Sequence, residues 1–177
     1  MRYKAMLLPP GDVYVFDVDG VLVDAAERLR EALRRLGVSS ASAPGELEPR
    51  LRQRFWEVFL SEELLALDRP RSVGIQLLLD RLGRGVVLVL TGRPYRLYRA
   101  TLRELQGFGV PVDRVVVSMR PRGDRRRDVE FKASVLARIP SVAEVHDDEL
   151  EVLEAARRLH PEARLFLHRG DSYEQVT

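Results

Sequence analysis

Short apolar runs alternate with longer stretches of helical periodicity over most of the chain. The runs are rich in valine and nearly continuously apolar, which is typical of parallel strands that are buried on both faces. The predicted strands are Val13–Phe16, Val86–Leu90, Arg114–Ser118, Val142–His146 and Arg164–Leu167. The stretches between them predict helices at Ser72–Leu82, Tyr95–Gln106, Phe131–Arg138 and Glu149–Leu159. This alternation predicts a doubly wound α/β fold, with right-handed crossovers and a parallel sheet of about five strands.

One segment interrupts the alternation. Ala25–Leu36 has the leucine spacing of an amphipathic helix, and Glu48–Leu67 predicts a second helix that carries several aromatic residues. Ser39–Pro44 is a small, polar break between the two. Because no convincing strand falls between residues 25 and 69, we expect a small helical cap inserted after the first strand. The expected division is a core domain of residues 1–24 and 72–177 and a cap of residues 25–71.

Size and composition suit a globular domain. The chain has 177 residues, of which 45% are hydrophobic, enough to bury a sizeable core. Its apolar runs are far shorter than the roughly 18–20 residues that a membrane span needs. The N-terminal residues lack the apolar region of a secretory signal, and the absence of cysteine excludes disulfides and thiolate chemistry. We therefore expect a cytoplasmic protein without a membrane partner.

The choice of basic residues draws attention to one lysine. The net charge is only +2, and Lys4 and Lys132 are the only lysines in a chain rich in arginine. Arginine can replace lysine on a surface, but not where a compact ammonium must fit, so Lys132 stands out. Arginine also fills five of the nine positions from Arg120 to Asp128. That stretch is either a solvated loop with its own aspartate partners or a clamp for a phosphorylated or polyanionic substrate.

Polar residues follow four of the predicted strands directly. In an open parallel sheet, ligands bind beyond the carboxyl ends of the strands. The groups found there are Asp17-Val18-Asp19-Gly20, Thr91-Gly92-Arg93, Ser118 followed by the arginine-rich stretch and Lys132, and Asp147-Asp148. We therefore expect these side chains to meet at one edge of the sheet.

These residue types suit phosphoryl transfer. Of Asp17 and Asp19, one carboxylate can attack phosphorus, and the other can exchange protons with the leaving oxygen and the attacking water. Asp147 and Asp148 add negative charge, and a carboxylate-rich site suits Mg²⁺. Groups that can bind phosphate are the Thr91 hydroxyl, the backbone N–H groups of Gly20 and Gly92, and the Lys132 ammonium.

Each motif also has a structural interpretation when it is taken alone. The pair Asp17 and Asp19 can cap a turn, and Thr91-Gly92 can form a strand-to-helix junction. Asp147-Asp148 can begin a helix, where the helix dipole favours negative charge. The combination of all these motifs favours the catalytic interpretation.

The motifs resemble those of the haloacid dehalogenase (HAD) superfamily. Val13–Leu22 resembles the first motif, Leu90–Pro94 the second, Lys132 the third and His146–Asp148 the fourth, in the family's order. The resemblance implies a Rossmann-like sheet with strand order 5-4-1-2-3. It also implies a phosphatase that forms a phospho-aspartate at Asp17, with Asp19 as the acid/base and with Thr91 and Lys132 binding phosphate. The implied Mg²⁺ ligands are Asp17, the Asp19 carbonyl and Asp147, with Asp148 in or just outside the ligand set.

A shorter resemblance concerns the stretch from Met119 to Lys132. It is similar to the residues before the third-motif lysine in polynucleotide kinase 3′-phosphatase domains, although the phosphate-binding loop of the kinase half is absent from the sequence. The similarity is carried by Met119-Arg120, Gly123-Asp124, Arg125, Asp128 and Lys132. Arg93 and Arg125 are the candidate substrate contacts.

We therefore predict an Mg²⁺-dependent phosphohydrolase that cleaves phosphomonoesters. Its partner would be a phosphorylated substrate, either a small molecule or a nucleic acid end. One alternative is a nucleic acid 3′-end phosphatase, and another is a non-catalytic, phosphate-binding or signalling module with the same fold. The sequence leaves the oligomeric state open.

Overall fold

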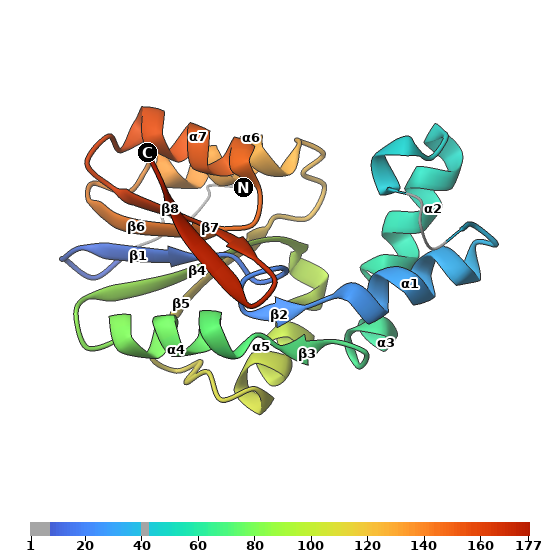
Figure 1. The fold of residues 1–177 in the computed structure, drawn as a ribbon, viewed down its shortest axis with the longest axis horizontal. Helices are drawn as coiled ribbons and strands as arrows, with labels where there is room; N and C mark the ends of the chain where they lie inside the picture. Colours follow the sequence, from blue (N-terminus) through green and yellow to red (C-terminus); the bar gives the residue numbers. More distant parts are fainter. Residues whose placement is uncertain (1–7, 40–42) are drawn as a thin grey trace.

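The computed structural model describes residues 8–39 and 43–177. Its centre is a six-stranded sheet in the order β5-β4-β1-β6-β7-β8 (Figure 1), in which every neighbouring pair is parallel except β7 and β8. The strands are β1 (Val13–Phe16), β4 (Val86–Pro94), β5 (Val116–Arg120), β6 (Val142–Asp147), β7 (Arg164–Arg169) and β8 (Ser172–Val176). Lys4 and part of the predicted break at Ser39–Pro44 lie outside the described residues.

The five predicted strands and their predicted order are confirmed. Some of the strand bounds differ. β4 continues beyond Leu90 to Pro94, so the second motif lies on the strand itself, and β5 lies two residues later than the predicted Arg114–Ser118, so Ser118 is within the strand and does not end it. The sheet also has an unpredicted strand, β8, an antiparallel edge strand whose residues are almost all exposed. Because β8 buries few side chains, it lacks the apolar run by which the other strands are predicted.

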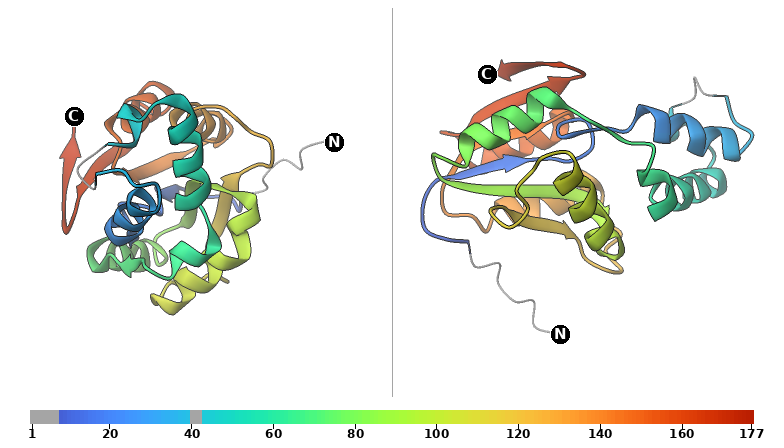
Figure 2. Two further views of the ribbon diagram at one scale, coloured as in Figure 1. Left: turned by 90° about the vertical axis from the view of Figure 1, so that its right-hand side faces the viewer. Right: turned by 90° about the horizontal axis from the view of Figure 1, so that it is seen from below.

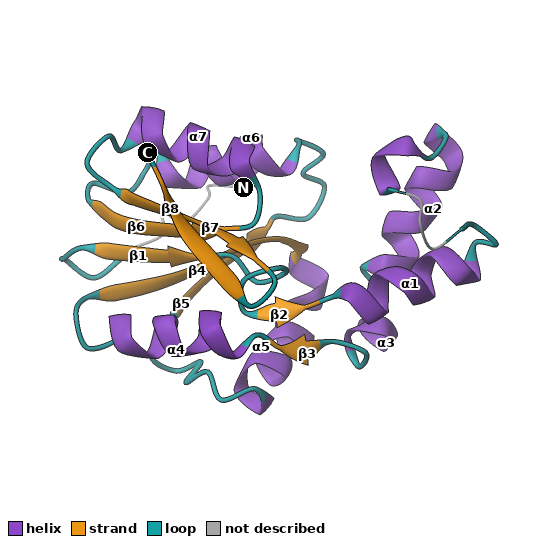
Figure 3. Ribbon diagram, viewed as in Figure 1, coloured by secondary structure: helices purple, strands orange, loops and turns teal. Residues whose placement is uncertain are grey.

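Helices cover both faces of the sheet, with α6 and α7 on one face and α4 and α5 on the other (Figures 1 and 3). They are α4 (Ser72–Arg81), α5 (Tyr98–Gly107), α6 (Asp128–Leu136) and α7 (Leu150–Leu159), and a 3₁₀ turn at Tyr95–Leu97 precedes α5. Alternate residues of β1 face the two layers. Val13 and Val15 pack toward Phe131 of α6, whereas Tyr14 and Phe16 pack in the cluster that contains Ile75 of α4.

The segment between β1 and α4 forms helices beside the sheet (Figure 2). They are α1 (Ala26–Arg35), a 3₁₀ turn at Pro44–Glu46, α2 (Pro49–Phe59) and α3 (Glu62–Leu65). The predicted single helix Glu48–Leu67 is wrong, because the chain breaks at Leu60 and Ser61 into α2 and α3. A short antiparallel pair, β2 (Val23–Asp24) and β3 (Arg69–Pro70), joins the two ends of the segment.

The helical segment has an apolar cluster of its own. Ala32, Leu33, Leu47, Phe55 and Leu64 are buried together there. Phe55 is fully buried, which agrees with a packing role for this aromatic residue. None of the helices in the described part of the chain has the length and apolar character needed to cross a membrane.

Candidate active site

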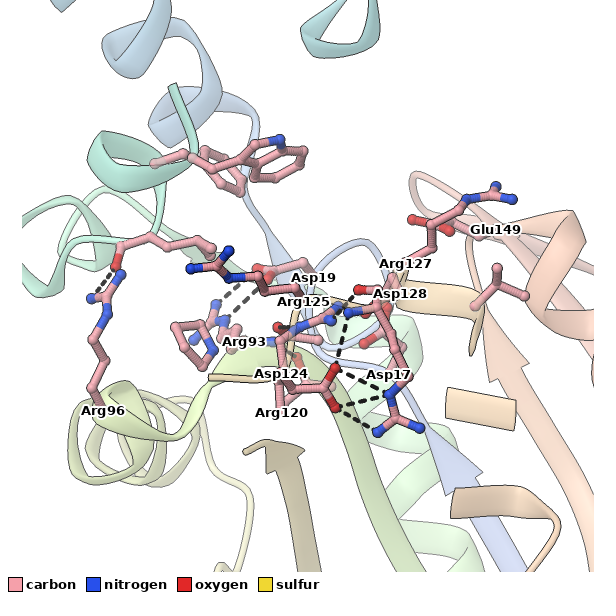
Figure 4. Close-up of a pocket in the computed structure, with 18 of the residues that line it drawn as sticks. Asp17, Asp19, Arg93, Arg96, Arg120, Asp124, Arg125, Arg127, Asp128 and Glu149 are labelled. Atoms are coloured by element: carbon pink, nitrogen blue, oxygen red, sulfur yellow. Dashed lines mark hydrogen bonds and ion pairs between the residues drawn. The ribbon is translucent and has the colours of Figure 1, made fainter. Parts of the chain in front are cut away.

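The polar residues at the carboxyl ends of β1, β4 and β6 gather at one end of the sheet. They line a cleft of about 910 Å³ whose opposite wall is the α2 region. Figure 4 shows residues that line this cleft, among them Asp17, Asp128 and Arg125. This is the edge of the sheet at which the motifs were predicted to meet, and the structure brings these residues together there.

Asp17 lies at the carboxyl end of β1 and is almost completely buried. Its Oδ2 is 3.0 Å from Lys132 Nζ, and the same ammonium is 2.8 Å from Asp147 Oδ2 and 3.0 Å from Asp128 Oδ2. Lys132 is buried on α6, and Asp128 lies one turn before it on the same helix. The conspicuous lysine is therefore enclosed by three carboxylates, which explains why a compact ammonium stands at this position.

Negative charge accumulates around Asp17. Burial raises the pKa of Asp17 well above its ordinary value; Lys132 opposes this rise, whereas Asp147 and Asp148 add to it. Burial, followed by repulsion from Asp147, raises the pKa of Asp148 to about 7. Burial would lower the pKa of Lys132, but the surrounding carboxylates raise it well above its ordinary value. One ammonium thus stands against four neighbouring carboxylates.

Three of these carboxylates are arranged to hold a cation. Asp17, Asp147 and Asp148 each offer an oxygen, and these oxygens lie within 4.8 Å of one another. Asp147 is oriented further by the backbone N–H of Glu149, which donates to its Oδ1 at 2.9 Å. Oxygen ligands and excess negative charge are the conditions that Mg²⁺ requires, so the residues present fit this ion.

Asp19 is oriented away from this group. Its carboxylate accepts hydrogen bonds from Arg93 Nε at 3.0 Å and Arg93 Nη2 at 2.8 Å, and it also binds Arg28 Nη2. Burial alone would raise the pKa of Asp19, but Arg93 and Arg28 outweigh burial and lower it to about 2. The Asp19 carboxylate is therefore separate from the group formed by Asp17, Asp147 and Asp148. The predicted metal ligand at this residue is its backbone carbonyl.

The two site glycines allow close approach of acidic side chains. Gly20 has a φ of +87°, and a Cβ there would lie 2.2 Å from Asp148 Oδ2. A Cβ on Gly92 would lie 1.9 Å from Asp128 Oδ1. The Gly20 N–H, a predicted phosphate donor, instead donates to the Val23 carbonyl at 2.8 Å and stabilises the turn after β1. Thr91 is buried, and its hydroxyl accepts from the Arg93 N–H at 3.2 Å.

The two candidate substrate arginines differ in their surroundings. Arg93 is buried among acids: it binds Asp19, Asp68 and Glu104, so its guanidinium is already engaged. Arg125 is exposed and lines the cleft. The geometry therefore favours Arg125 over Arg93 as a residue that meets a substrate.

The arginine-rich stretch combines both interpretations of its sequence. Several arginines have acidic partners: Arg126 binds Asp124, and Arg127 binds Glu151 at 2.5 Å. The same loop nevertheless forms one wall of the cleft, through Arg120 and residues 124–129. Its internal ion pairs shape the wall that a substrate would meet.

Sequence reasoning missed several residues of the site. Asp128 appeared only within a resemblance, although its spacing of four residues before Lys132 was a usable signal for a contact on one helix. Trp56 also lines the cleft, with 44% of its surface exposed. Nothing in the sequence distinguishes Arg28 from the other arginines of α1, and Asp68 likewise carries no local signal.

No family model matches the sequence, and no curated protein matches it. A haloacid dehalogenase-like hydrolase from Streptococcus pneumoniae is similar in structure, with a TM-score of 0.63, 14% identity, and coverage of 87% of this chain and 82% of that chain. A hydrolase from Pseudomonas syringae has a TM-score of 0.58, 16% identity, and coverage of 88% and 82%.

A third similar structure comes from the Pnkp1/Rnl/Hen1 RNA repair complex. The TM-score is 0.56 at 18% identity, and the match covers 93% of this chain but only 46% of the other. All three identities are low, so these similarities bear on the fold. The topology, the order of the motifs and these matches together show that the chain has the fold of the haloacid dehalogenase-like hydrolases.

Proposed function

We propose that the protein is an Mg²⁺-dependent phosphohydrolase that cleaves phosphomonoesters through a phospho-aspartate at Asp17. The observation that carries this proposal is the position of Asp17 in the cleft, buried beside Lys132 and grouped with Asp147 and Asp148. When bound by these three aspartates, Mg²⁺ supplies positive charge that keeps them ionised beside a phosphate dianion. In this proposal, residues 25–71 act as a cap over the cleft.

The reaction has two halves. In the first, a carboxylate oxygen of Asp17 forms a bond to phosphorus while the ester P–O bond breaks, and the leaving oxygen takes a proton from Asp19. In the second, water attacks the phospho-aspartate and gives a proton to Asp19, which releases phosphate and restores Asp17. Lys132 and Thr91 bind the phosphoryl oxygens, Lys132 through its charge and Thr91 through its hydroxyl.

The contacts of Asp19 favour the second half as the structure stands. Two arginines hold this carboxylate ionised, which is the form that accepts a proton from water. To serve as the acid in the first half, Asp19 must gain a proton, and the negative charge of a bound phosphoester would favour that gain.

The test replaces the nucleophile. Asp17→Asn keeps the size of the side chain but removes its charge, so we expect turnover of a generic aryl phosphate with Mg²⁺ to fall by at least about 10³-fold. Asp113→Asn, at an exposed position outside the cleft, is the matched control and should retain wild-type turnover. Undiminished turnover in Asp17→Asn would refute the nucleophile assignment. No turnover by the wild type on any phosphoester would favour the non-catalytic alternative.

A second candidate function is removal of a 3′-phosphate from a nucleic acid end. The exposed Trp56 ring lies in the wall of the cleft, and Arg96, Arg125 and Arg127 also line the cleft. A nucleobase can stack on an exposed tryptophan, and guanidinium groups bind the neighbouring phosphates. The similar structure from an RNA repair complex adds a reason to test this substrate class.

If the substrate is a nucleic acid end, replacing the cleft residues that contact it should lower activity on oligonucleotides but not on small phosphoesters. Trp56→Leu and Arg125→Gln should lower kcat/KM for a 3′-phosphorylated oligonucleotide by about tenfold each, while turnover of a small aryl phosphate changes little. Arg122→Gln, on the same loop but outside the cleft lining, is the matched control. Equal activity on oligonucleotides and small phosphoesters in the wild type would count against a nucleic acid substrate.

A further inference from the structure

A buried ionic cluster joins the helical segment to the core. Its members come from both sides: Arg28 of α1 and Asp68 before β3 belong to the segment, and Asp19, Arg93 and Glu104 belong to the core. The side chains of Arg28 and Asp68 are completely buried, and that of Arg93 is 1% exposed. Such burial is unusual for charged groups, which are rarely removed from water unless they are closely paired.

The ion pairs of this cluster cross the boundary in both directions. Arg28 Nε donates to Asp68 Oδ1 at 2.8 Å within the segment, and its Nη2 reaches Asp19 in the core. Arg93 binds Asp19 within the core, and its Nη2 reaches Asp68 at 3.1 Å in the segment. Each arginine therefore binds carboxylates of both sides: Arg28 binds one of each, and Arg93 binds Asp19 and Glu104 in the core and Asp68 in the segment.

Arg28 is fixed by the helical segment as well as by the carboxylates. Its guanidinium lies 4.2 Å from the centre of the Phe59 ring, and its Nη1 donates to the Phe59 carbonyl at 3.4 Å. Phe59 ends α2, the helix that forms the far wall of the cleft. A shift of α2 relative to the core would thus pull directly on the group that holds Asp19.

We propose that Arg28 is a positioning residue that couples the seating of the cap to the orientation of the Asp19 carboxylate. The proposal rests on the proposed function, in which Asp19 exchanges protons with the leaving group and water. Arg28 does not touch the substrate; it acts by fixing Asp19, and its own position depends on Phe59 and Asp68 of the cap. The cap then does more than cover the cleft, because its position determines how Asp19 is presented to a bound substrate.

The test compares Arg28→Lys and Arg28→Gln with wild type on two esters of different leaving ability. Proton donation matters for phenyl phosphate, which has a poor leaving group, and much less for 2,4-dinitrophenyl phosphate, which has a good one. We expect kcat for phenyl phosphate to fall on the order of 100-fold in Arg28→Gln and less in Arg28→Lys. For the dinitrophenyl ester the fall should stay below about tenfold.

The control is Arg30→Gln. Arg30 lies on the same helix and pairs with Glu27 at the surface, so its replacement should leave both esters unaffected. Equal losses for both esters in Arg28→Lys and Arg28→Gln would show that Arg28 only supports the fold, and would overturn the proposal. If Arg28→Gln does not fold, the same comparison is made with Arg28→Lys, which keeps the positive charge.

A second measurement follows the cap without turnover. Trp56 is the only tryptophan of the chain and lies on α2 in the cleft wall, so its fluorescence reports on the cap. Asp19→Asn, a change in the core, should increase quenching of Trp56 by acrylamide, and Arg28→Lys should do the same, whereas Arg30→Gln should not. Unchanged quenching in both would overturn the coupling. Wild-type protein that hydrolyses neither ester would instead refute the proposed function, and the quenching comparison would still test the coupling.

Discussion

At the scale of single residues, the site is defined by an imbalance of charge. Lys132 contacts Asp17, Asp128 and Asp147, and Asp148 stands beside them. Burial is the main reason that the pKa values of Asp17 and Asp148 are raised, and repulsion between the neighbouring carboxylates raises them further. A divalent cation would relieve this repulsion, so the arrangement favours the binding of one.

Replacing one member of the acidic group should weaken cation binding. In Asp148→Asn, we expect the affinity for Mg²⁺ to fall by about tenfold or more, because one anionic oxygen is lost from the three that lie together. Titration calorimetry and the rise of Tm with added Mg²⁺ measure this directly. Glu154→Gln, an exposed position on α7, is the control. Wild-type affinity in Asp148→Asn would place the cation elsewhere.

At Gly92, a single added methyl group should disturb the site. The methyl group of Gly92→Ala would lie 1.9 Å from Asp128 Oδ1 and would displace the carboxylate that orients Lys132 and Arg120. We expect kcat to fall by about tenfold or more and stability to fall by about 1–2 kcal/mol. Gly107→Ala, with no atom near the added methyl, should retain activity. Wild-type kinetics in Gly92→Ala would mean that Asp128 does not position Lys132.

At the scale of elements, an aromatic stack helps to align the strands that carry the acids. His146 lies between Phe16 and Phe166, with ring centroids 4.3 and 4.7 Å away and nearly parallel planes. Phe16 precedes Asp17, and His146 precedes Asp147, so the stack fixes the register of β1, β6 and β7 next to the site. His146 also bonds Glu144 at 3.1 Å and His168 at 3.0 Å. This packing gives His146 a structural role beside the site.

The buried His168 should make this layer sensitive to acid. Burial, with a contribution from His146, lowers the pKa of His168 to about 4 from an ordinary value of 6.5. Between pH 6.5 and about 4, His168 is protonated in the unfolded chain but neutral in the folded chain. The free energy of unfolding therefore falls as the pH drops through this range.

His168→Gln should remove that contribution. We expect its free energy of unfolding to vary less with pH between 6.5 and 4 than that of wild type, by on the order of 1–2 kcal/mol. Urea denaturation at a series of pH values measures this pH dependence. Loss of the hydrogen bond to His146 lowers stability by a constant amount and does not change the slope. Parallel pH profiles of the two proteins would show that His168 is not held neutral by the fold.

At the scale of the whole molecule, the boundary between the helical segment and the core is ionic as well as apolar. The buried cluster contains two arginines against Asp19, Asp68 and Glu104, so it has one carboxylate in excess. Glu104 Oε1 is buried and has no hydrogen-bond partner among the described residues. Burial and the neighbouring Glu104 raise the pKa of Asp68 to about 8, although Arg28 opposes the rise. The folded protein thus retains a proton that balances the cluster.

Because of this retained proton, the free energy of unfolding should fall as the pH rises toward about 8. The folded state binds a proton that the unfolded state has released. Glu104→Gln removes the excess charge, so we expect a smaller loss of stability between pH 6 and 8, by about 1 kcal/mol. The matched control is Glu62→Gln, an exposed acid on α3. An unchanged pH profile in Glu104→Gln would contradict this charge balance.

The sequence predicted the layers of the fold and the place of the site. Strands buried on both faces leave continuous apolar runs, and their order along the chain, together with a family resemblance, predicted the strand order that the structure has. The acids and Thr91 were found because parallel strands deliver the residues after them to one edge. Lys132 was found because it is rare in the chain, and the structure places it against Asp17.

Only the tertiary structure decided how these residues are partnered. Asp19 meets Arg28 and Arg93, which lie 9 and 74 positions away, and Arg28 meets Asp68 across 40 positions. Periodicity reports which face of an element is buried, but it carries no information about which charged groups meet across an interface. The exposed edge strand β8 and the break at Ser61 also depend on neighbours rather than on local pattern. The chain alone thus indicated which strand ends carry the acids, and packing decided which groups line the cleft and which hold one another.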